Sequence, residues 1–178
     1  MPGRPLDRSF DEIYSRDATA LNRYLRRLTL SRTTAEDLLQ ETFLRLHVQL
    51  RDGAEIENVR AWLFRVATHL AHDKGKAQAR AQVRERRYEA SARVVDIQPA
   101  LDQRHDVRRA LGLLPPRMRQ VILLHAEGFS YKELAEITGV EPGYAGVLLQ
   151  RARAEFKRIF EDHGEQTRDR RPGHLRRP

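Results

Sequence analysis

GFSYKELAEITGVEPGYAGVLLQRARAEFKR, residues 128–158, contains two helix-forming segments separated by a short turn. Ser130 and Glu133 have the spacing of a capping box, which satisfies free backbone N–H groups at the start of a helix. Gly139 suits the end of that helix, and Pro142 suits the first position of the next one. The stretch therefore predicts a helix-turn-helix, a motif whose second helix typically enters a groove of DNA.

The second helix of this motif has few polar groups where a DNA-reading helix would present them. Apolar residues at steps of four, three, four and three form its predicted buried face: Ala145, Leu149, Ala152, Phe156 and Ile159. The opposite face holds Gly143, Tyr144, Val147 and Arg151, flanked by Leu148, Gln150 and Ala154. Such a helix either binds DNA through shape, phosphates and thymine methyl groups, or docks on a protein. We favour DNA binding and keep protein docking as the alternative.

The rest of the chain shows the same helical periodicity, with apolar residues every three or four positions. Three such stripes precede residue 74: Phe10, Ile13, Tyr14, Leu21, Tyr24, Leu25 and Leu28; Leu38, Leu39, Thr42, Phe43, Leu46 and Leu50; and Val59, Trp62, Leu63, Val66, Ala67 and Leu70. A capping box at residues 34–37 and an N-cap at Asn58 are expected to start two of these helices. No alternating strand pattern or Asn-Gly hairpin signal is present. The predicted fold class is all-α.

A change in composition divides the chain into two halves. Residues 74–93 hold seven basic and two acidic side chains and few large apolar residues. We therefore predict two small helical domains joined by a flexible basic linker. The expected boundaries are residues 1–76 for the first domain, 77–104 for the linker, 105–160 for the helix-turn-helix domain and 161–178 for a disordered basic tail.

Charge and composition limit the partners and the location of the protein. The 178 residues carry a formal net charge of +8, which favours a polyanionic partner such as nucleic acid. No apolar run is long enough to span a bilayer or to form a signal peptide, so a cytoplasmic location without membrane insertion is expected. The chain has no cysteine, which excludes disulfides and thiolate metal sites.

Two blocks of sequence resemble a known family. DLLQETFLRL (residues 37–46) with VRAWLFRVATHLAHD (residues 59–73) resembles region two of the extracytoplasmic function (ECF) sigma factors of bacterial RNA polymerase. LPPRMRQVILLHAEGFSYKELAEITGV (residues 114–140), with RAR at residues 151–153, resembles their region four. The resemblance implies a non-enzymatic protein without a cofactor or a small-molecule substrate. It would bind core RNA polymerase, direct it to promoter DNA and help open the promoter, and an anti-sigma factor would hold it inactive.

The resemblance also assigns roles to individual positions. The helix that docks on the polymerase matches Asp37, Leu38, Gln40, Glu41, Phe43 and Leu44. The element that melts and reads the minus-ten region matches Asp52, Gly53, Glu55, Asn58, Arg60, Trp62, Arg65, His69, Asp73, Lys74 and Lys76. The minus-thirty-five element would contact Ser130, Tyr131, Lys132, Gly143, Tyr144, Val147, Leu148, Gln150, Arg151 and Arg153. We expect Trp62 to belong to the core, because it shares a stripe with Val59 and Val66.

Two positions depart from the family pattern. His69 stands where the family often has asparagine, which changes the hydrogen-bonding groups near the DNA. His69, His72 and Asp73 also have a spacing that occurs in helical metal sites, but no other ligand motif accompanies them, and no metal site is predicted. The second departure is Tyr144-Ala145-Gly146-Val147-Leu148, where the family typically has Thr-Val-Lys-Ser-Arg.

Two other classes of protein remain as alternatives. An ordinary helix-turn-helix regulator would use the second half alone and would leave the block at residues 37–73 unexplained. A sigma-like module that only binds proteins would explain the apolar reading helix.

Overall fold

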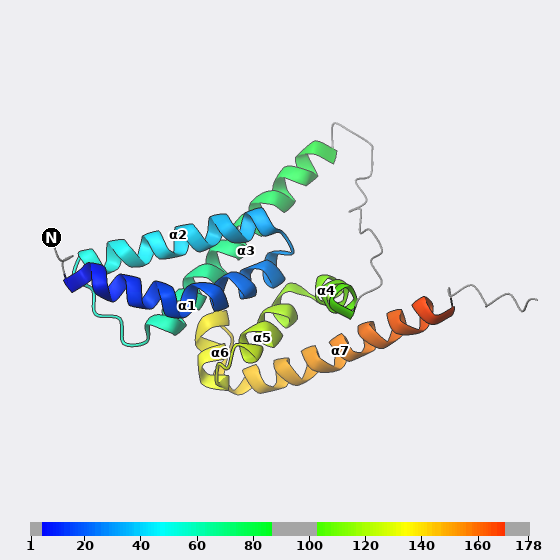
Figure 1. Ribbon diagram of the computed structural model, residues 1–178. Coiled ribbons are helices and arrows are strands. Elements are labelled where there is room, and N and C mark those ends of the chain that lie inside the picture. The colour runs from blue at the N-terminus through cyan, green and yellow to red at the C-terminus, as the bar shows by residue number, and fades with distance from the viewer. Residues whose placement is uncertain (1–4, 87–102, 170–178) are drawn as a thin grey trace, which may run out of the picture.

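The computed structural model describes residues 5–86 and 103–169, and these residues form helices and connecting turns without a strand (Figure 1). The seven helices of this part of the chain are α1 (Pro5–Thr29), α2 (Arg32–Arg51), α3 (Val59–Arg86), α4 (Gln103–Leu113), α5 (Pro116–Ala126), α6 (Tyr131–Thr138) and α7 (Pro142–Asp169). The all-α prediction is confirmed.

The first half is a bundle of α1, α2 and α3. A tight turn joins α1 to α2 through Leu30, whose φ of 59° lies in the left-handed region. Ser31 is the N-cap of α2, because its hydroxyl accepts a hydrogen bond from the backbone N–H of Thr34 at 3.2 Å. The helix therefore starts before the capping box expected at residues 34–37. The cap predicted for α3 is confirmed, since the Asn58 side-chain oxygen accepts from the Ala61 N–H at 2.9 Å.

The centre of this bundle differs from the predicted stripes at two positions on α1. Tyr14 is exposed, and its ring packs on Phe43 from the side. Asp17 is not part of the predicted apolar stripe, and it is fully buried. Tyr24 and Phe64 fill the bundle centre, and the Tyr24 hydroxyl lies 2.7 Å from the Thr68 hydroxyl. Burial raises the pKa of Tyr24 well above its ordinary value, because no water solvates a phenolate there.

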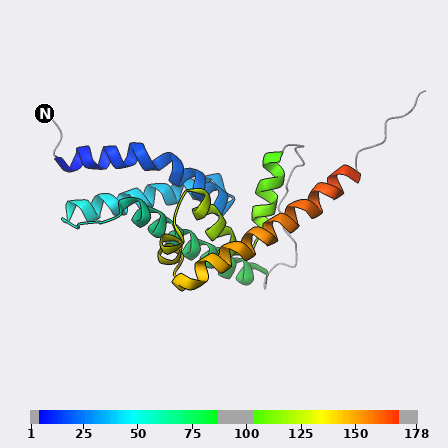
Figure 2. The same cartoon turned by 90° about the horizontal axis from the view of Figure 1, so that it is seen from below.

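The second half contains the predicted helix-turn-helix. The capping box of α6 is present: the Ser130 hydroxyl accepts from the Glu133 N–H, and the Glu133 carboxylate accepts from the Ser130 N–H at 2.8 Å. The backbone N–H and the hydroxyl of Ser130 both donate to the Glu133 carboxylate, and these two bonds lower the pKa of Glu133. Gly139 closes α6 with a φ of 68°, and Pro142 is the first residue of α7, as predicted. Both α5 and α6 pack on α7, and α4 crosses it further along (Figure 2).

Two helices continue past the boundaries expected from composition. Residues 77–86 of the predicted linker belong to α3, and residues 161–169 of the predicted tail belong to α7. The segment after residue 76 contains Ala77, Ala79 and Ala81 between glutamine and arginine, which are all good helix formers. Residues 87–102 of the predicted linker and 170–178 of the predicted tail lie outside the described residues.

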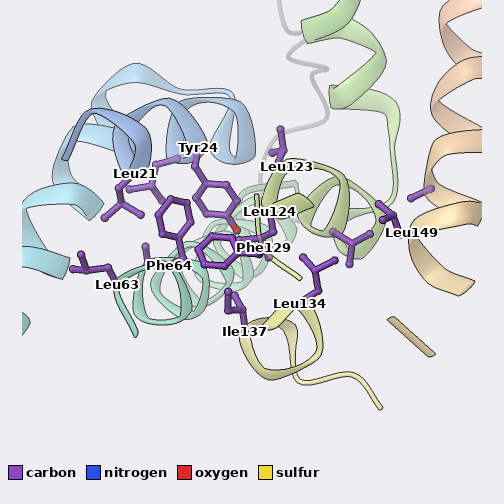
Figure 3. Packing of buried hydrophobic residues seen from close by; sticks show 14 of the residues in the cluster. Leu21, Tyr24, Leu63, Phe64, Leu123, Leu124, Phe129, Leu134, Ile137 and Leu149 are labelled. Carbon is purple, nitrogen blue, oxygen red and sulfur yellow. The ribbon is translucent and has the colours of Figure 1, made fainter. Parts of the chain in front are cut away.

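The two halves share one continuous hydrophobic core. The ring centroids of Phe64 on α3 and of Phe129, which precedes α6, lie 4.9 Å apart. Both side chains are buried (Figure 3). A second junction forms at Arg119 on α5. Its guanidinium donates hydrogen bonds to the carbonyl oxygens of Leu111, Gly112 and Leu114 in the second half, and of Leu28 at the end of α1. Burial lowers the pKa of this guanidinium.

Candidate nucleic-acid and protein interfaces

The outer face of α2 carries an exposed leucine among polar residues. Leu44 is 59% exposed, and the side chains of Gln40 and Asp37 are exposed on the same face. Leu38 and Phe43 of the same predicted set are buried and hold α2 on the bundle. Exposed large apolar groups surrounded by polar ones are common in protein-binding surfaces. The face suits a protein partner.

Glu41 and Asp37 are partly engaged within the chain. The Arg45 guanidinium donates to the Glu41 carboxylate at 2.8 Å along α2. Lys74 of α3 pairs with the Asp37 carboxylate at 2.9 Å. Lys74 was expected to contact promoter DNA, and Asp37 was expected to contact the polymerase. Because the two side chains form an ion pair, they link the two predicted surfaces.

The loop before α3 and one face of α3 form a continuous exposed strip. Asp52, Gly53, Glu55 and Asn58 are exposed in the loop, and Gly53 has a φ of 78°. Trp62, Arg65, His69, Asp73 and Lys76 follow at steps of three, four, four and three, which places them on one face of the helix. Trp62 is half-buried against the core, as expected, and the other four are exposed.

Arg60 leaves this strip and turns toward the second half. Its guanidinium lies over the rings of Phe64 and Phe129, at 5.5 and 5.4 Å from their centroids. It donates to the backbone carbonyl of Glu127 at 2.9 Å and lies 3.6 Å from the buried carboxylate of Asp17. The structure thus separates Arg60 from the other residues predicted to contact the minus-ten region.

The exposed face of α7 begins with glycine and aromatic residues. Tyr144 and Val147 are 41% and 43% exposed, and Arg151 is exposed one turn further along. The start of α6 also exposes Ser130, Tyr131 and Lys132, and α7 exposes Gln150 next to Arg151.

Two residues of this predicted set lie elsewhere on α7. Leu148 is 6% exposed and belongs to the core, in contrast to its predicted position beside the reading face. It is buried because α7 packs against three helices, so more of its circumference is covered than a single apolar stripe indicates. Arg153 is exposed, but two residues rotate an α-helix by about 200°, so it projects from the flank opposite Arg151.

Gly143 and Gly146 have no packing requirement within the chain. A Cβ atom placed on either glycine would meet no atom within 4 Å, and neither residue has a positive φ. Glycine in a helix interior costs about 1 kcal/mol relative to alanine. The two glycines therefore reduce the stability of α7, although packing within the chain does not require them. Because they carry no side chain, a binding partner can come close to the helix backbone at these positions.

The described residues offer neither a clustered metal site nor a membrane-spanning helix. Within residues 5–86 and 103–169, no three histidine, cysteine, aspartate or glutamate side chains cluster in a way that could hold a metal ion. None of the helices in the described part of the chain has the length and apolar content to cross a membrane.

Comparison with known families matches both halves separately. Residues 13–81 match the model of Sigma-70 region 2, and residues 104–156 match the model of Sigma-70, region 4. The chain is 31% identical over 171 residues to the ECF RNA polymerase sigma factor SigE of Mycolicibacterium smegmatis, covering 89% of this chain and 64% of the relative. It is 30% identical to the sigma factor EcfG of Rhodopseudomonas palustris, and the match covers 74% of each chain.

Solved structures give the same result. The sigma factor RpoE of Bartonella quintana, in complex with the anti-sigma factor NepR, superposes with a TM-score of 0.67 at 26% identity over 86% of this chain and 97% of that chain. CnrH, in complex with the cytosolic domain of CnrY, superposes with a TM-score of 0.65 at 25% identity, covering 88% and 90% of the two chains.

A helical bundle matching region 2, followed by a helix-turn-helix domain matching region 4, defines a protein of the sigma-70 class. Within that class, the chain belongs to the ECF sigma factors. Proteins of this family direct RNA polymerase to promoters and are not enzymes. The resemblance of the two sequence blocks is thereby confirmed, and the alternatives of an isolated helix-turn-helix regulator or a mere binding module are set aside.

Proposed function

We propose that three surfaces of this chain divide the work of promoter recognition. The outer face of α2, with Gln40 and Leu44 at its centre, binds core RNA polymerase. The loop at residues 52–58 and the exposed face of α3 melt and read the minus-ten element. The start of α6 and the exposed face of α7 bind the minus-thirty-five element.

The observation that carries this proposal is the continuous strip on α3. Arg65, His69, Asp73 and Lys76 share one exposed face, and they follow directly from the exposed loop that ends at Asn58. Melted DNA offers both phosphates and unpaired base edges. A strip that combines cationic, imidazole and carboxylate groups can contact both. The half-buried Trp62 lies at the start of this strip, where it packs against the core.

On α7 we propose contact with DNA through backbone and methyl groups rather than through polar probes. Tyr144 and Val147 are exposed where a reading helix meets base edges, and Arg151 is placed to bind a phosphate. Docking on a protein remains the second candidate for this face, because its exposed groups are mainly apolar.

The solved relatives point to a further partner. RpoE was solved in complex with the anti-sigma factor NepR, and CnrH was solved in complex with the cytosolic domain of CnrY. We propose that this chain also binds an anti-sigma factor and acts in the cytoplasm, where polymerase and promoter DNA are found.

The experiment that tests the polymerase surface compares two exposed leucines. Leu44→Ala, alone or combined with Gln40→Ala, should weaken binding to core polymerase by about fivefold or more, since truncating an interface anchor costs over about 1 kcal/mol. Leu113→Ala on α4 is the matched control, because Leu113 is 56% exposed and lies in the second half. Equal affinities of the Leu44 and Leu113 variants, measured by fluorescence titration, would reject the assignment of α2.

A further inference from the structure

A cavity of about 500 Å³ lies where the turn between α1 and α2 meets α3 and α5. Its walls come from the α1–α2 junction, from residues 71–79 of α3 and from the start of α5. Cavities of roughly 300–1,000 Å³ are typical of small-molecule sites in proteins. Apart from Lys74 and Lys76, the residues of this lining belong to none of the three surfaces proposed above.

The lining of the cavity is positively charged. Lys74, Lys76 and Arg119 carry three formal charges, and no described aspartate or glutamate is among the lining residues. Lys74 is paired with Asp37, which lies outside the lining. Lys76 and Arg119 form no ion pair within residues 5–86 and 103–169. A hollow lined by charges of one sign favours a ligand of the opposite sign, so this cavity suits an anion.

Arg119 retains a hydrogen-bond donor for such an anion. A guanidinium has five N–H groups. Four hydrogen bonds to backbone carbonyl oxygens are present: from Nε to Leu111, from Nη1 to Leu28, and from Nη2 to Gly112 and Leu114. The second N–H of Nη1 has no partner among the described residues, and both Arg119 and Leu28 line the cavity. Because burial lowers the pKa of Arg119, an anion beside it would stabilise its charge.

The N-terminal end of α2 borders the same cavity through Ser31 and Thr34. The Ser31 hydroxyl caps the helix by accepting from the Thr34 N–H, and the first turn of α2 has no acidic side chain. The first backbone N–H groups of a helix lie at the positive end of its dipole, where phosphate groups bind. Arg119 and the start of α2 therefore offer donors to one anion from two elements.

The rest of the lining is apolar or open. Leu28, Ala71 and Pro116 contribute apolar surface. Gly75 contributes open space, because a Cβ atom placed on it would meet no atom within 4 Å. Ligand sites commonly combine apolar walls with a few polar groups that orient the ligand. A molecule with an anionic end and a flat ring system fits this combination.

We infer that the cavity binds a nucleotide, with its phosphates between Arg119 and the N-terminus of α2 and its base against Leu28 and Pro116. The nucleotide is a bound effector, and no reaction is assigned to it. Because Lys74 and Lys76 also line the cavity, a bound nucleotide competes with promoter DNA for these two lysines. That consequence rests on the proposed function, whereas the site itself does not.

The test uses the free full-length protein, without polymerase or DNA. ADP and GDP that carry an N-methylanthraniloyl fluorophore on the ribose are titrated with the protein. At least one of them should bind saturably with a Kd in the micromolar range. Inorganic pyrophosphate should displace it, because the phosphates provide the charge that the cavity recognises. Adenosine and guanosine at the same concentration should displace it far less.

Two threonines in the first turn of α2 provide a matched pair of variants. Thr34→Glu introduces a carboxylate into the lining and should weaken nucleotide binding by at least about tenfold, because like charges then meet. Thr33→Glu makes the same change at an exposed position outside the lining, and solvent screening should limit its effect to about twofold. An acidic side chain is favourable at a helix start, so both variants should fold, as circular dichroism checks.

A second variant tests the shape of the cavity rather than its charge. Gly75→Leu fills the open space on α3 without introducing a charge, and it should also weaken binding by at least about tenfold. Its effect should appear with the nucleotide and not in the circular dichroism spectrum of the free protein.

Several results would overturn the inference: no saturable binding of either nucleotide, no displacement by pyrophosphate, equal affinities of the Thr33 and Thr34 variants, or full affinity in Gly75→Leu. A labelled single-stranded DNA is titrated in parallel. If Thr34→Glu weakened its binding while neither nucleotide bound the parent, the cavity would belong to the DNA backbone and the inference would be wrong. Failure of the proposed function would show separately, as absence of promoter-specific transcription by the parent protein with core polymerase.

Discussion

The two glycines of α7 provide the sharpest test of how this chain meets upstream DNA. Replacing Gly143 and Gly146 with alanine adds two methyl groups that meet no atom of the chain within 4 Å. Alanine is favoured over glycine by about 1 kcal/mol in a helix interior, and by less in the first turn, where Gly143 lies. The double variant should therefore gain about 1–1.5 kcal/mol in free energy of unfolding, which raises Tm by roughly 2–6 °C.

The same methyl groups should weaken promoter binding if the helix backbone lies close to DNA. Overpacking of a tight contact by a methyl group typically costs about 1–3 kcal/mol, or about five- to 150-fold in affinity. The assay is anisotropy of a labelled upstream promoter fragment with holoenzyme, beside thermal unfolding followed by circular dichroism. Gly75→Ala in α3 is the control, since a Cβ there also meets nothing within 4 Å. It should stabilise the fold and leave upstream binding unchanged.

A stabilised double variant that binds the upstream element as tightly as the parent would refute close approach at Gly143 and Gly146. In that case the glycines would have no role at the DNA, and docking of α7 on a protein would become the better explanation of its apolar face.

Three further predictions follow from individual side chains. Arg151→Ala should weaken binding to all upstream sequences alike and should reduce the slope of log affinity against log salt concentration by about one ion. Val147→Ser should instead change the preference at one base pair by about 1 kcal/mol. Binding to a library randomised in the upstream element measures both effects. Arg119→Met leaves several backbone carbonyl oxygens without their donor, which costs about 1–3 kcal/mol and should lower Tm by about 2–12 °C. Arg117→Met, at an exposed neighbouring position, should change Tm little. The pKa of Tyr24 is raised in the folded state, whereas an unfolded tyrosine ionises at about pH 10. The free energy of unfolding of the parent should therefore fall as pH rises above about 10. In Tyr24→Phe this free energy should depend less on pH, as measured by urea titrations at alkaline pH.

Local signals in the sequence predicted the helix-turn-helix well. The capping box of α6, Gly139 at the end of α6 and Pro142 at the start of α7 depend on neighbouring residues only, and all appear in the structure. Helical periodicity likewise located the main core positions, including Leu21, Leu46 and Leu149.

Features that depend on contacts between distant segments were not accessible in the same way. Leu148 is buried because three helices pack on α7. The buried carboxylate of Asp17 on α1 lies 3.6 Å from the Arg60 guanidinium on α3. The family resemblance assigned Arg60 to the minus-ten interface, and the structure places its guanidinium against the backbone carbonyl of Glu127 in the second half. No spacing rule signals a contact between residues 60 and 127.

Composition gave an incomplete account of the segment between the halves. A basic, alanine-rich segment was expected to serve as a linker from residue 77, but the same alanines favour helix and extend α3 to Arg86. Charge alone does not distinguish a solvated helix from an irregular linker.

The central claim is that this chain directs core polymerase to specific promoters, and transcription in a defined system tests it most directly. Purified core polymerase is supplied with genomic DNA of the source organism, with and without the protein, and the 5′ ends of the transcripts are sequenced. The account predicts a small set of reproducible start sites that require the protein, share common upstream sequences at two separated positions, and disappear with Leu44→Ala but not with Leu113→Ala. Start sites identical with and without the protein would contradict it.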